Sequence, residues 1–431
     1  MPGADLVRRH VLKSLAQYWR DAPFLIESLP VASISIAAVN GPLKLKAVNL
    51  PSWASSCGVD GILLVPCEAV PSPMSTCWNE VDWFLASFLI LECVHERAWE
   101  NTNNTIHSYS FRIKDWDKRI WDYAWVNRYA LFLRQWAAVE NSTDADQLFG
   151  SLPKPCITLT HDVDAISKTS PIRIKFFCFK LFNIARYLFR LKPSRAFKEI
   201  KKLALYLLSQ EDWNILASLA QLEASQGIKA VYHFYADYRP KSVFRWLLDP
   251  DNFVRALSNS GIFRILIRCG HHIGLHPSID SWNNSALIAT QRANLSQVVN
   301  INIVHCRQHW LRFSWQETWL VQEKAGIAFD STLMFNDRSG FRNGAAVRWC
   351  PWNFSANKSH QLSAIPTVLM DSHLYDYEQL SEAARQNQII KIIRECKYVH
   401  GHAYVLWHPH TLTKDYGWIQ GFDQLLAVLK T

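Results

Sequence analysis

The chain has 431 residues with a formal net charge of +9; 49% of its residues are hydrophobic and 19% are charged. This composition is typical of a globular protein, and the length suits one barrel with an accessory unit. Charges interrupt the longest apolar stretches well short of the ~20 residues that span a bilayer, which excludes a transmembrane protein. The positive charge favours phosphate-bearing ligands, anionic lipid surfaces or nucleic acid without choosing among them.

The ten cysteines are scattered, without CxxC pairs or regular spacing. We therefore expect reduced, mostly buried thiols rather than a disulfide framework or a zinc ribbon. The amino terminus has no apolar run before a small-residue cleavage site, so no secretory signal is expected. These features predict a cytoplasmic protein.

Residues 1–150 are predicted to form a smaller, accessory α/β domain. Three strand-like runs, ISIAAVN, LKLKAVN and GILLVPCEA, lie within 31–69, and Asn40-Gly41 gives a hairpin signal between the first two. Helical patterns follow over 81–97 and 125–139. No cluster of chemically active side chains stands out in this region, which favours a scaffold or a rim around a substrate site.

The stretch CITLTHDVDA, residues 156–165, runs from a strand pattern directly into two carboxylates. It follows a linker-like segment, where we place the start of a second domain over 151–431. Side chains at the carboxyl end of such a strand project into the crevice where α/β proteins bind ligands. Of Asp162 and Asp164, one could hold a cation while the other takes a proton from water; a turn or helix cap is the structural alternative.

A basic helical insertion is predicted over 171–210. Drawn as a helix, its first half gathers Phe177, Leu181 and Leu188 on one side, while lysines and arginines lie towards the other. Such a helix can lie on an anionic membrane surface, or its apolar face can pack on the parent domain. Packing on the parent domain is the more common arrangement, and the second half, which is also basic, adds slightly to the case for a membrane surface.

Strand-like runs then alternate with helical ones. After the first strand come AVYHFYAD, HHIGLHPS, NINIVHCRQHW, IAFDSTLMF, AIPTVLMD and YVLWHPH, which makes seven in all. Alternating β and α units favour a parallel sheet, and nearly every one of these strands ends in polar residues. We therefore predict an α/β fold, a distorted (β/α)7-type barrel with its site at the carboxyl ends of the strands.

Histidine and carboxylate side chains at one further strand end suit a metal. His276 ends this strand, His272 lies on the same face by alternation, and Asp280 follows four residues later. Imidazole with carboxylate is the ligand mixture expected of zinc or a neighbouring divalent ion. A single histidine at a strand end is often only a hydrogen-bonded structural residue, but the Asp pair at another strand end favours a ligand role for His276.

Cationic and imidazole groups end two later strands. Arg307 could orient a carboxylate through its planar guanidinium, and His309 and Arg312 lie close to it in the sequence. A basic surface loop is the alternative for this segment. His408 ends the last strand and could protonate a leaving group if no metal binds it; a structural histidine is the alternative there.

Five motifs occur in a fixed order: THDVD, GLHPS, RQHWLR, FDST followed by SGFRNG, and LWH. In this order they resemble the polysaccharide deacetylase family, carbohydrate esterase family four, in a divergent branch with an N-terminal extension. The resemblance runs from about Cys156 to the end of the chain, and residues 80–139 resemble the extension of that branch. It implies a NodB-like barrel with a divalent metal, usually zinc.

Carried over position by position, the resemblance implies three catalytic residues. Asp162 matches the general base, and Arg307 matches the arginine that orients this base. His408 matches the general acid that protonates the leaving amine. The usual family sequence has two adjacent Asp, whereas Val163 separates them in this chain.

The resemblance implies a metal site made of Asp164, His276 and a third ligand. His276 matches the first histidine of a paired-histidine motif, and the second position of that motif holds Asp280. Asp280 is therefore the expected third ligand, with His309 or His272 as alternatives. Side chains near the same motifs are expected to bind substrate, namely His309, Trp310, Arg312, Asp330 and Arg342.

The resemblance implies a metal-dependent N-deacetylase that hydrolyses the amide of an N-acyl amino sugar. The missing export signal favours a surface-polysaccharide or lipid-linked precursor, handled in the cytoplasm or at the inner membrane face. A catalytically silent carbohydrate-binding or scaffold protein on the same fold is one alternative, and an amidohydrolase acting on a non-sugar amide is another. A carbohydrate and an anionic membrane surface are the expected partners, and nucleic acid is not expected.

Overall fold

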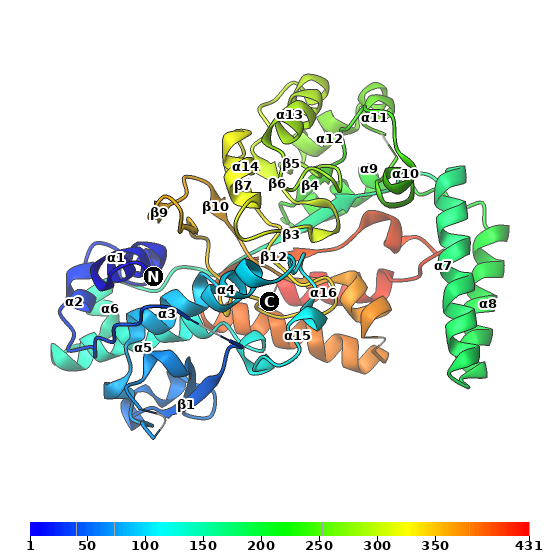
Figure 1. Ribbon diagram of the computed structural model, residues 1–431. Helices are drawn as coiled ribbons and strands as arrows, with labels where there is room; N and C mark the ends of the chain where they lie inside the picture. Colours follow the sequence, from blue (N-terminus) through cyan, green and yellow to red (C-terminus); the bar gives the residue numbers. More distant parts are fainter. Residues whose placement is uncertain (40, 73, 252, 379, 431) are drawn as a thin grey trace.

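The computed structural model describes the chain from residue 1 to residue 431, apart from residues 40, 73, 252, 379 and 431 and the side chain of residue 179. Its centre is an eight-stranded sheet in which every neighbouring pair is parallel, in the order β10-β7-β6-β5-β4-β3-β12-β11 (Figure 1). Within the described residues, no helix is long and apolar enough to cross a membrane.

The sheet confirms the predicted fold class, a distorted α/β barrel. All seven expected runs supply strands, and a short extra strand, β10, forms one edge. The strands are β3 (Cys156–Val163), β4 (Val231–Phe234), β5 (His272–Leu275), β6 (His305–Cys306), β7 (Phe329–Asp330), β10 (Ser363–Ala364), β11 (Thr367–Met370) and β12 (His402–Leu406). A separate two-stranded ribbon pairs β8 (Trp352–Asn353) with β9 (Lys358–Ser359).

The two sides of the curled sheet approach each other at Thr367 on β11. Its hydroxyl donates to the carbonyl of Ser331 at 2.8 Å, and its backbone N–H donates to the carbonyl of Leu333 at 3.1 Å. Both carbonyls follow strand β7, which lies near the opposite edge of the sheet. The two sides of the barrel are therefore connected by hydrogen bonds from Thr367 to the segment after β7, and not by a closed ladder of strand-to-strand hydrogen bonds.

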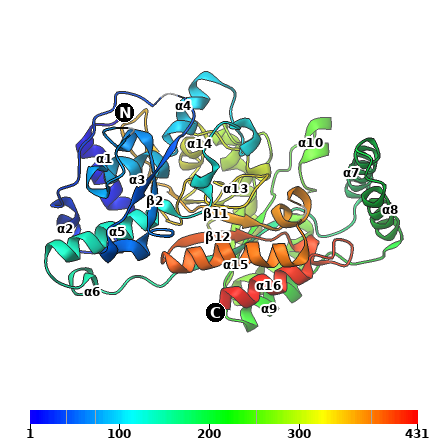
Figure 2. The same cartoon turned by 90° about the horizontal axis from the view of Figure 1, so that it is seen from below.

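Helices connect the strands and cover the outside of the sheet (Figures 1 and 2). Most of them bury an apolar face, as amphipathic helices packed on a sheet do, whereas the buried residue of α10 is Arg245. These helices are α9 (Leu216–Ser225), α10 (Val243–Leu248), α11 (Val254–Ser260), α12 (Ile262–Arg268), α13 (Ser285–Val299), α14 (Thr318–Lys324), α15 (Glu382–Tyr398) and α16 (Ile419–Lys430).

The N-terminal region contains helices and one small antiparallel sheet. Its elements are α1 (Ala4–Ser14), α2 (Pro23–Glu27), β1 (Leu45–Asn49), β2 (Ile62–Pro66), α3 (Trp83–Leu91), α4 (Val94–Thr102), α5 (Trp125–Glu140) and α6 (Ala145–Phe149). The first expected strand, ISIAAVN, is wrong: residues 34–39 have no regular structure. The hairpin signal at Asn40-Gly41 falls partly outside the described residues.

The N-terminal region shares one hydrophobic core with the barrel. A single cluster of buried side chains extends from Val7 in α1 to Leu426 in α16. At its centre the buried carboxylate of Glu92 accepts hydrogen bonds from His10 and Arg97, and also from the Trp349 indole and the Trp352 backbone of the barrel. The expected domain boundary near residue 150 stays a prediction. Residues on either side of it pack into the same hydrophobic core.

Helices α7 (Ser170–Phe189) and α8 (Pro193–Leu208) form an antiparallel hairpin that projects from one side of the molecule in both views (Figures 1 and 2). The expected insertion over 171–210 is thus helical. It follows the carboxyl end of β3 directly, which places its base beside the candidate site.

Candidate metal and catalytic site

The carboxyl ends of β3, β5 and β6 bring three ligand-type side chains together. Asp164, His276 and His309 each offer one ligand atom, and these atoms all lie within 4.8 Å of one another. The Oδ1 atom of Asp164 lies 3.4 Å from His276 Nε2 and 3.9 Å from His309 Nε2. Two ligands of a tetrahedral zinc ion at 2.0–2.2 Å are about 3.3–3.6 Å apart, so the three groups are spaced nearly as a metal requires.

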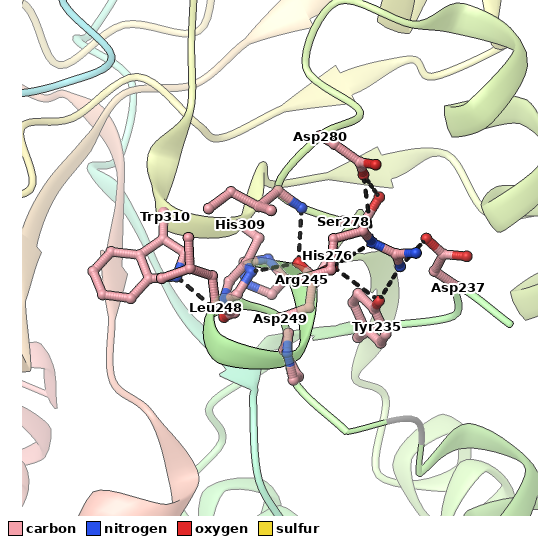
Figure 3. Close-up of polar contacts among 12 residues, drawn as sticks. Tyr235, Asp237, Arg245, Leu248, Asp249, His276, Ser278, Asp280, His309 and Trp310 are labelled. Atoms are coloured by element: carbon pink, nitrogen blue, oxygen red, sulfur yellow. Dashed lines mark hydrogen bonds and ion pairs between the residues drawn. The ribbon is translucent and has the colours of Figure 1, made fainter. Parts of the chain in front are cut away.

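Both imidazoles are held by their other nitrogen. Nδ1 of His276 donates to the carbonyl of Arg307 at 2.7 Å. Nδ1 of His309 lies 3.3 Å from a carboxylate oxygen of Asp249 (Figure 3). This arrangement turns each Nε2 atom towards Asp164. Burial lowers the pKa of His276, which favours the neutral imidazole that binds metals.

The Oδ1 atom of Asp164 is buried and accepts no hydrogen bond from the described residues. An unsatisfied buried carboxylate oxygen is costly unless a cation or a proton compensates it. With two Nε2 atoms facing this oxygen, the donor set of one carboxylate and two imidazoles fits zinc or a similar divalent ion.

The structure does not place Asp280, the expected third ligand, in this group; His309, one of the alternatives, lies there instead. The chain turns after His276, and the Asp280 carboxylate accepts a hydrogen bond from the Ser278 hydroxyl at 2.6 Å (Figure 3). Arg239 also donates to this carboxylate at 2.9 Å. The other alternative, His272, lies at the amino end of β5 and is exposed, with its ring beside His305.

The carboxylate of Asp162 lies next to the ligand group and is buried in the barrel. Its Oδ1 atom lies 3.2 Å from both the Arg307 guanidinium and His233 Nδ1, and its Oδ2 atom lies 3.9 Å from His276 Nδ1. Burial opposes the charge, but Arg307, His276 and His233 outweigh burial and hold the pKa of Asp162 well below its usual value. The Asp162 carboxylate is therefore ionised at neutral pH, the form that can accept a proton.

Arg307 is fully buried and contacts several strands as well as Asp162. Its guanidinium donates to the Thr160 hydroxyl on β3 at 2.7 Å, to the Thr367 hydroxyl on β11 at 3.1 Å and to the Ser331 carbonyl at 3.2 Å. The structure thus places the Arg307 guanidinium in contact with the Asp162 carboxylate.

His408 approaches the group from the end of β12. Its Nε2 atom lies 3.6 Å from Asp164 Oδ2, and its Nδ1 atom donates to the buried carboxylate of Asp371 at 2.8 Å. Burial would lower the pKa of His408, but Asp371 and Asp164 outweigh burial and raise it to about 10. A protonated imidazole at neutral pH is a proton donor.

The residues expected to bind substrate divide into two groups. His309 and Trp310 lie at the site, and Trp310 is 42% exposed. The guanidinium of Arg312 lies nearby and packs over the Trp282 ring. Asp330 and Arg342, in contrast, are buried and not available to substrate, so the expectation for these two residues is wrong.

Asp330 and Arg342 are buried structural residues. The Asp330 carboxylate accepts hydrogen bonds from the Trp319 indole, the Gln322 amide and the Thr332 hydroxyl. Arg342 is paired with Glu96 of the N-terminal region at 2.7 Å. Sequence spacing placed both near a turn, but it could not show that their partners lie inside the core.

Three residues of the site were missed by sequence reasoning. Asp371 ends the run AIPTVLMD, so a carboxylate at a strand end was an available signal. His233 lies inside a strand and Asp249 lies in the loop after α10, and nothing in their local sequence marks them. Their roles depend on contacts with His309, Asp162 and other residues that are distant in sequence.

Comparison with known proteins finds likeness only among solved structures: no protein-family model and no curated protein matches the chain. A proposed polysaccharide deacetylase from Mycobacterium smegmatis is 15% identical with a TM-score of 0.36, covering 64% of this chain and 85% of that one. A chitin deacetylase from the fungal pathogen Colletotrichum lindemuthianum is 13% identical with a TM-score of 0.34, covering 64% and 82%. A CE4 family pseudoenzyme from Bacillus anthracis is 11% identical with a TM-score of 0.29, covering 64% and 61%.

The polysaccharide deacetylase family, to which these structures are assigned, is the one that the ordered sequence motifs predict.

Proposed function

We propose that the protein is a metal-dependent deacylase that hydrolyses the amide of an N-acyl amino sugar. One observation carries this proposal: a carboxylate and two imidazoles suited to a divalent metal lie between an ionised carboxylate, Asp162, and an imidazole with a raised pKa, His408. Amide hydrolysis needs a proton acceptor for water and a proton donor for the leaving nitrogen, and the site offers both.

The residues that would hold the metal are Asp164, His276 and His309. A divalent ion bound there would polarise the acyl carbonyl and make a water molecule more acidic. The backbone carbonyl of Arg307 and the carboxylate of Asp249 fix the two imidazole rings, so the ligand atoms are oriented before a metal arrives.

The chain's own groups then divide the proton transfers. Asp162 accepts the proton of the attacking water at a carboxylate oxygen, and Arg307 keeps that carboxylate ionised and fixed. His408 donates its Nε2 proton to the amine nitrogen as the carbon–nitrogen bond breaks. Asp371, bonded to the opposite ring nitrogen, stabilises the charged imidazole before donation.

The substrate class is supported by the ordered sequence motifs and by Trp310. This partly exposed indole lies next to His309 and offers an aromatic face of the kind on which sugar rings pack. A panel of N-acetylated amino sugars beside simple non-sugar amides tests this part, with released acetate as the readout. Faster hydrolysis of the non-sugar amides would contradict the sugar assignment.

Bound metal is the direct test of the site. We expect mass spectrometry to find about one zinc ion per wild-type chain after mild chelation and return of zinc, and much less in Asp164→Ala, His276→Ala and His309→Ala. Asp280→Ala is the matched control, because it removes a nearby carboxylate from outside the ligand group, and it should retain zinc. Absence of metal from the wild type would contradict the hydrolase and favour a silent carbohydrate-binding protein.

A further inference from the structure

The hairpin of α7 and α8 exposes many large apolar side chains. Phe189 and Leu191 at its tip are 90% and 88% exposed, values expected of side chains that have no protein to pack on. We call this set the hairpin surface; its exposed apolar members are Ile174, Phe177, Leu181, Phe182, Leu188, Phe189, Leu191, Phe197, Ile200, Leu205, Leu207 and Leu208.

The same hairpin is strongly basic. Between residues 170 and 208 there are ten lysines and arginines and one acidic residue, Glu199. Glu199 is already engaged by Lys180 at 2.8 Å and by Lys202 at 3.5 Å. Apolar side chains flanked by excess positive charge are typical of helices that lie in the headgroup region of anionic bilayers.

The hairpin is held firmly at its base. The ring of Phe176 stacks on Tyr206 at 3.8 Å between centroids, which joins α7 to α8, and Tyr206 also packs beside Trp213. Lys168, just before α7, forms a buried ion pair with Asp415 at 2.5 Å. A ligand bound by the projecting part would therefore fix the orientation of the barrel.

The exposed apolar surface continues from the hairpin to the site. Helix α10 lies beside α7, and its Val243, Phe244 and Leu247 are 86%, 54% and 52% exposed (Figure 1). The Trp310 indole then donates to the carbonyl of Leu248 at the end of α10 at 3.3 Å, next to His309 (Figure 3). Exposed apolar side chains thus occur on the hairpin, on the neighbouring helix α10 and at Trp310 beside His309.

We propose that the hairpin surface docks on an anionic phospholipid bilayer and turns the mouth of the site towards that bilayer. The part about the site depends on the proposed deacylase, and it implies a substrate whose amino sugar is held at the membrane by a lipid. The hairpin lies in the interface, because no helix among the described residues is suited to span the bilayer. Helix α7, with 20 residues, is about 30 Å long and lies along the membrane surface.

Charge favours a bilayer over a second copy of the chain. Two copies that met through this surface would bring the exposed cationic side chains of one hairpin, such as Arg190, Lys192 and Lys198, against those of the other. Like charges at such an interface oppose association, whereas anionic headgroups complement both the charges and the apolar side chains. The experiment must therefore also detect self-association of the protein, which light scattering does.

Co-sedimentation with vesicles tests the docking on the full-length protein. We expect binding to phosphatidylglycerol/phosphatidylethanolamine vesicles, much weaker binding to phosphatidylcholine vesicles, and weakening as salt rises. Changing Phe182, Phe189 and Phe197 to Ser should weaken binding to the anionic vesicles at least about tenfold. Changing Arg190, Lys192 and Lys198 to Ser should have a similar effect, because each basic residue near the surface adds to binding.

Two control variants change three basic or three exposed apolar residues elsewhere on the surface. Lys44, Lys114 and Lys154 to Ser remove the same charge, and Phe24, Met74 and Ile419 to Ser remove exposed apolar groups; both should bind vesicles as the wild type does. Equal binding to both vesicle types, no vesicle binding, or a dimer in light scattering that only the hairpin variants disperse would each overturn the proposal.

The docking proposal and the deacylase proposal can be tested separately. Hairpin variants should retain zinc and hydrolyse a short soluble N-acetyl sugar at the wild-type rate, while losing at least about tenfold in rate on a lipid-linked sugar in anionic vesicles. Asp164→Ala should lose zinc and soluble-substrate activity while its vesicle binding stays unchanged. That variant therefore tests the proposed deacylase without testing the docking. Equal rates of wild type and hairpin variants on the lipid-linked sugar would overturn the membrane-facing site.

Discussion

Asp249 lies behind His309: its Oδ1 atom is 3.3 Å from His309 Nδ1 and also accepts the backbone N–H of Ile279 at 2.8 Å. Burial opposes the charge on Asp249, but His309, the Ile279 N–H and Arg245 outweigh it and lower its pKa to about 2. A carboxylate in this position fixes the ring and makes Nε2 a better metal ligand.

We therefore expect Asp249→Asn to weaken zinc binding by about 10- to 100-fold, with the fold intact. The measurement is a competition titration with a chromophoric zinc chelator. Asp280→Asn is the control, because it neutralises a carboxylate on the same rim that does not contact either histidine. An unchanged zinc affinity in Asp249→Asn would contradict the role given to this residue.

His408→Gln should lower kcat on an N-acetyl amino sugar by about 10²–10⁴-fold while zinc content stays the same, because it removes the proton donor for the leaving amine. Asp371→Asn should show the same pattern more weakly, since it removes only the group that stabilises the charged ring. Steady-state kinetics beside metal analysis separate this effect from metal loss. A substrate amide with a much better leaving group should recover part of the rate in His408→Gln, and no recovery would count against a proton-donor role.

Glu92 should make stability fall in acid. Burial opposes its charge, but the hydrogen bond from His10 and the Arg97 guanidinium outweigh burial and lower its pKa. Because the pKa is lower in the folded state, this contribution is fully present above pH ~4.5 and is lost as pH falls through the folded pKa. Thermal unfolding of Glu92→Gln between pH 7 and pH 3 should show a lower stability at pH 7 and a weaker pH dependence than the wild type. Glu317→Gln, an exposed carboxylate, should follow the wild-type curve.

Arg342 should affect stability rather than substrate binding. Arg342→Met leaves the Glu96 carboxylate buried and unpaired, which costs about 3–5 kcal/mol of unfolding free energy. The double variant Glu96→Leu with Arg342→Met should recover much of that loss in urea unfolding. A raised KM for a soluble sugar without any loss of stability would restore the original expectation that Arg342 binds substrate.

The strand pattern in the sequence predicted the parallel sheet because buried strands leave a local signal that tertiary contacts rarely reverse. The Asp162/Asp164 pair, His276, Arg307 and His408 could be expected together because the carboxyl ends of parallel strands meet at one edge. Their catalytic and ligand roles stay predictions until the measurements above are made.

The predictions that proved wrong concern residues whose structure is determined by partners distant in the sequence. Asp280 is four residues from His276, but Arg239, from a different loop, holds its carboxylate away from the ligand group. Local spacing contains no information about that arginine. The run ISIAAVN has a strand-like composition, but its described residues, 34–39, pair with no neighbouring strand, and a single run without a partner forms no sheet.

Arg307 connects Thr160 on β3 with Thr367 on β11 and contacts Asp162 through the same guanidinium. One side chain thus helps to hold the barrel together and sets the charge of the proposed base. A substitution of Arg307 would therefore change the charge of Asp162 and also the contacts between β3 and β11. A lineage that lost catalysis would therefore still be under pressure to keep this arginine, so its presence in a relative indicates an intact barrel more surely than an active one.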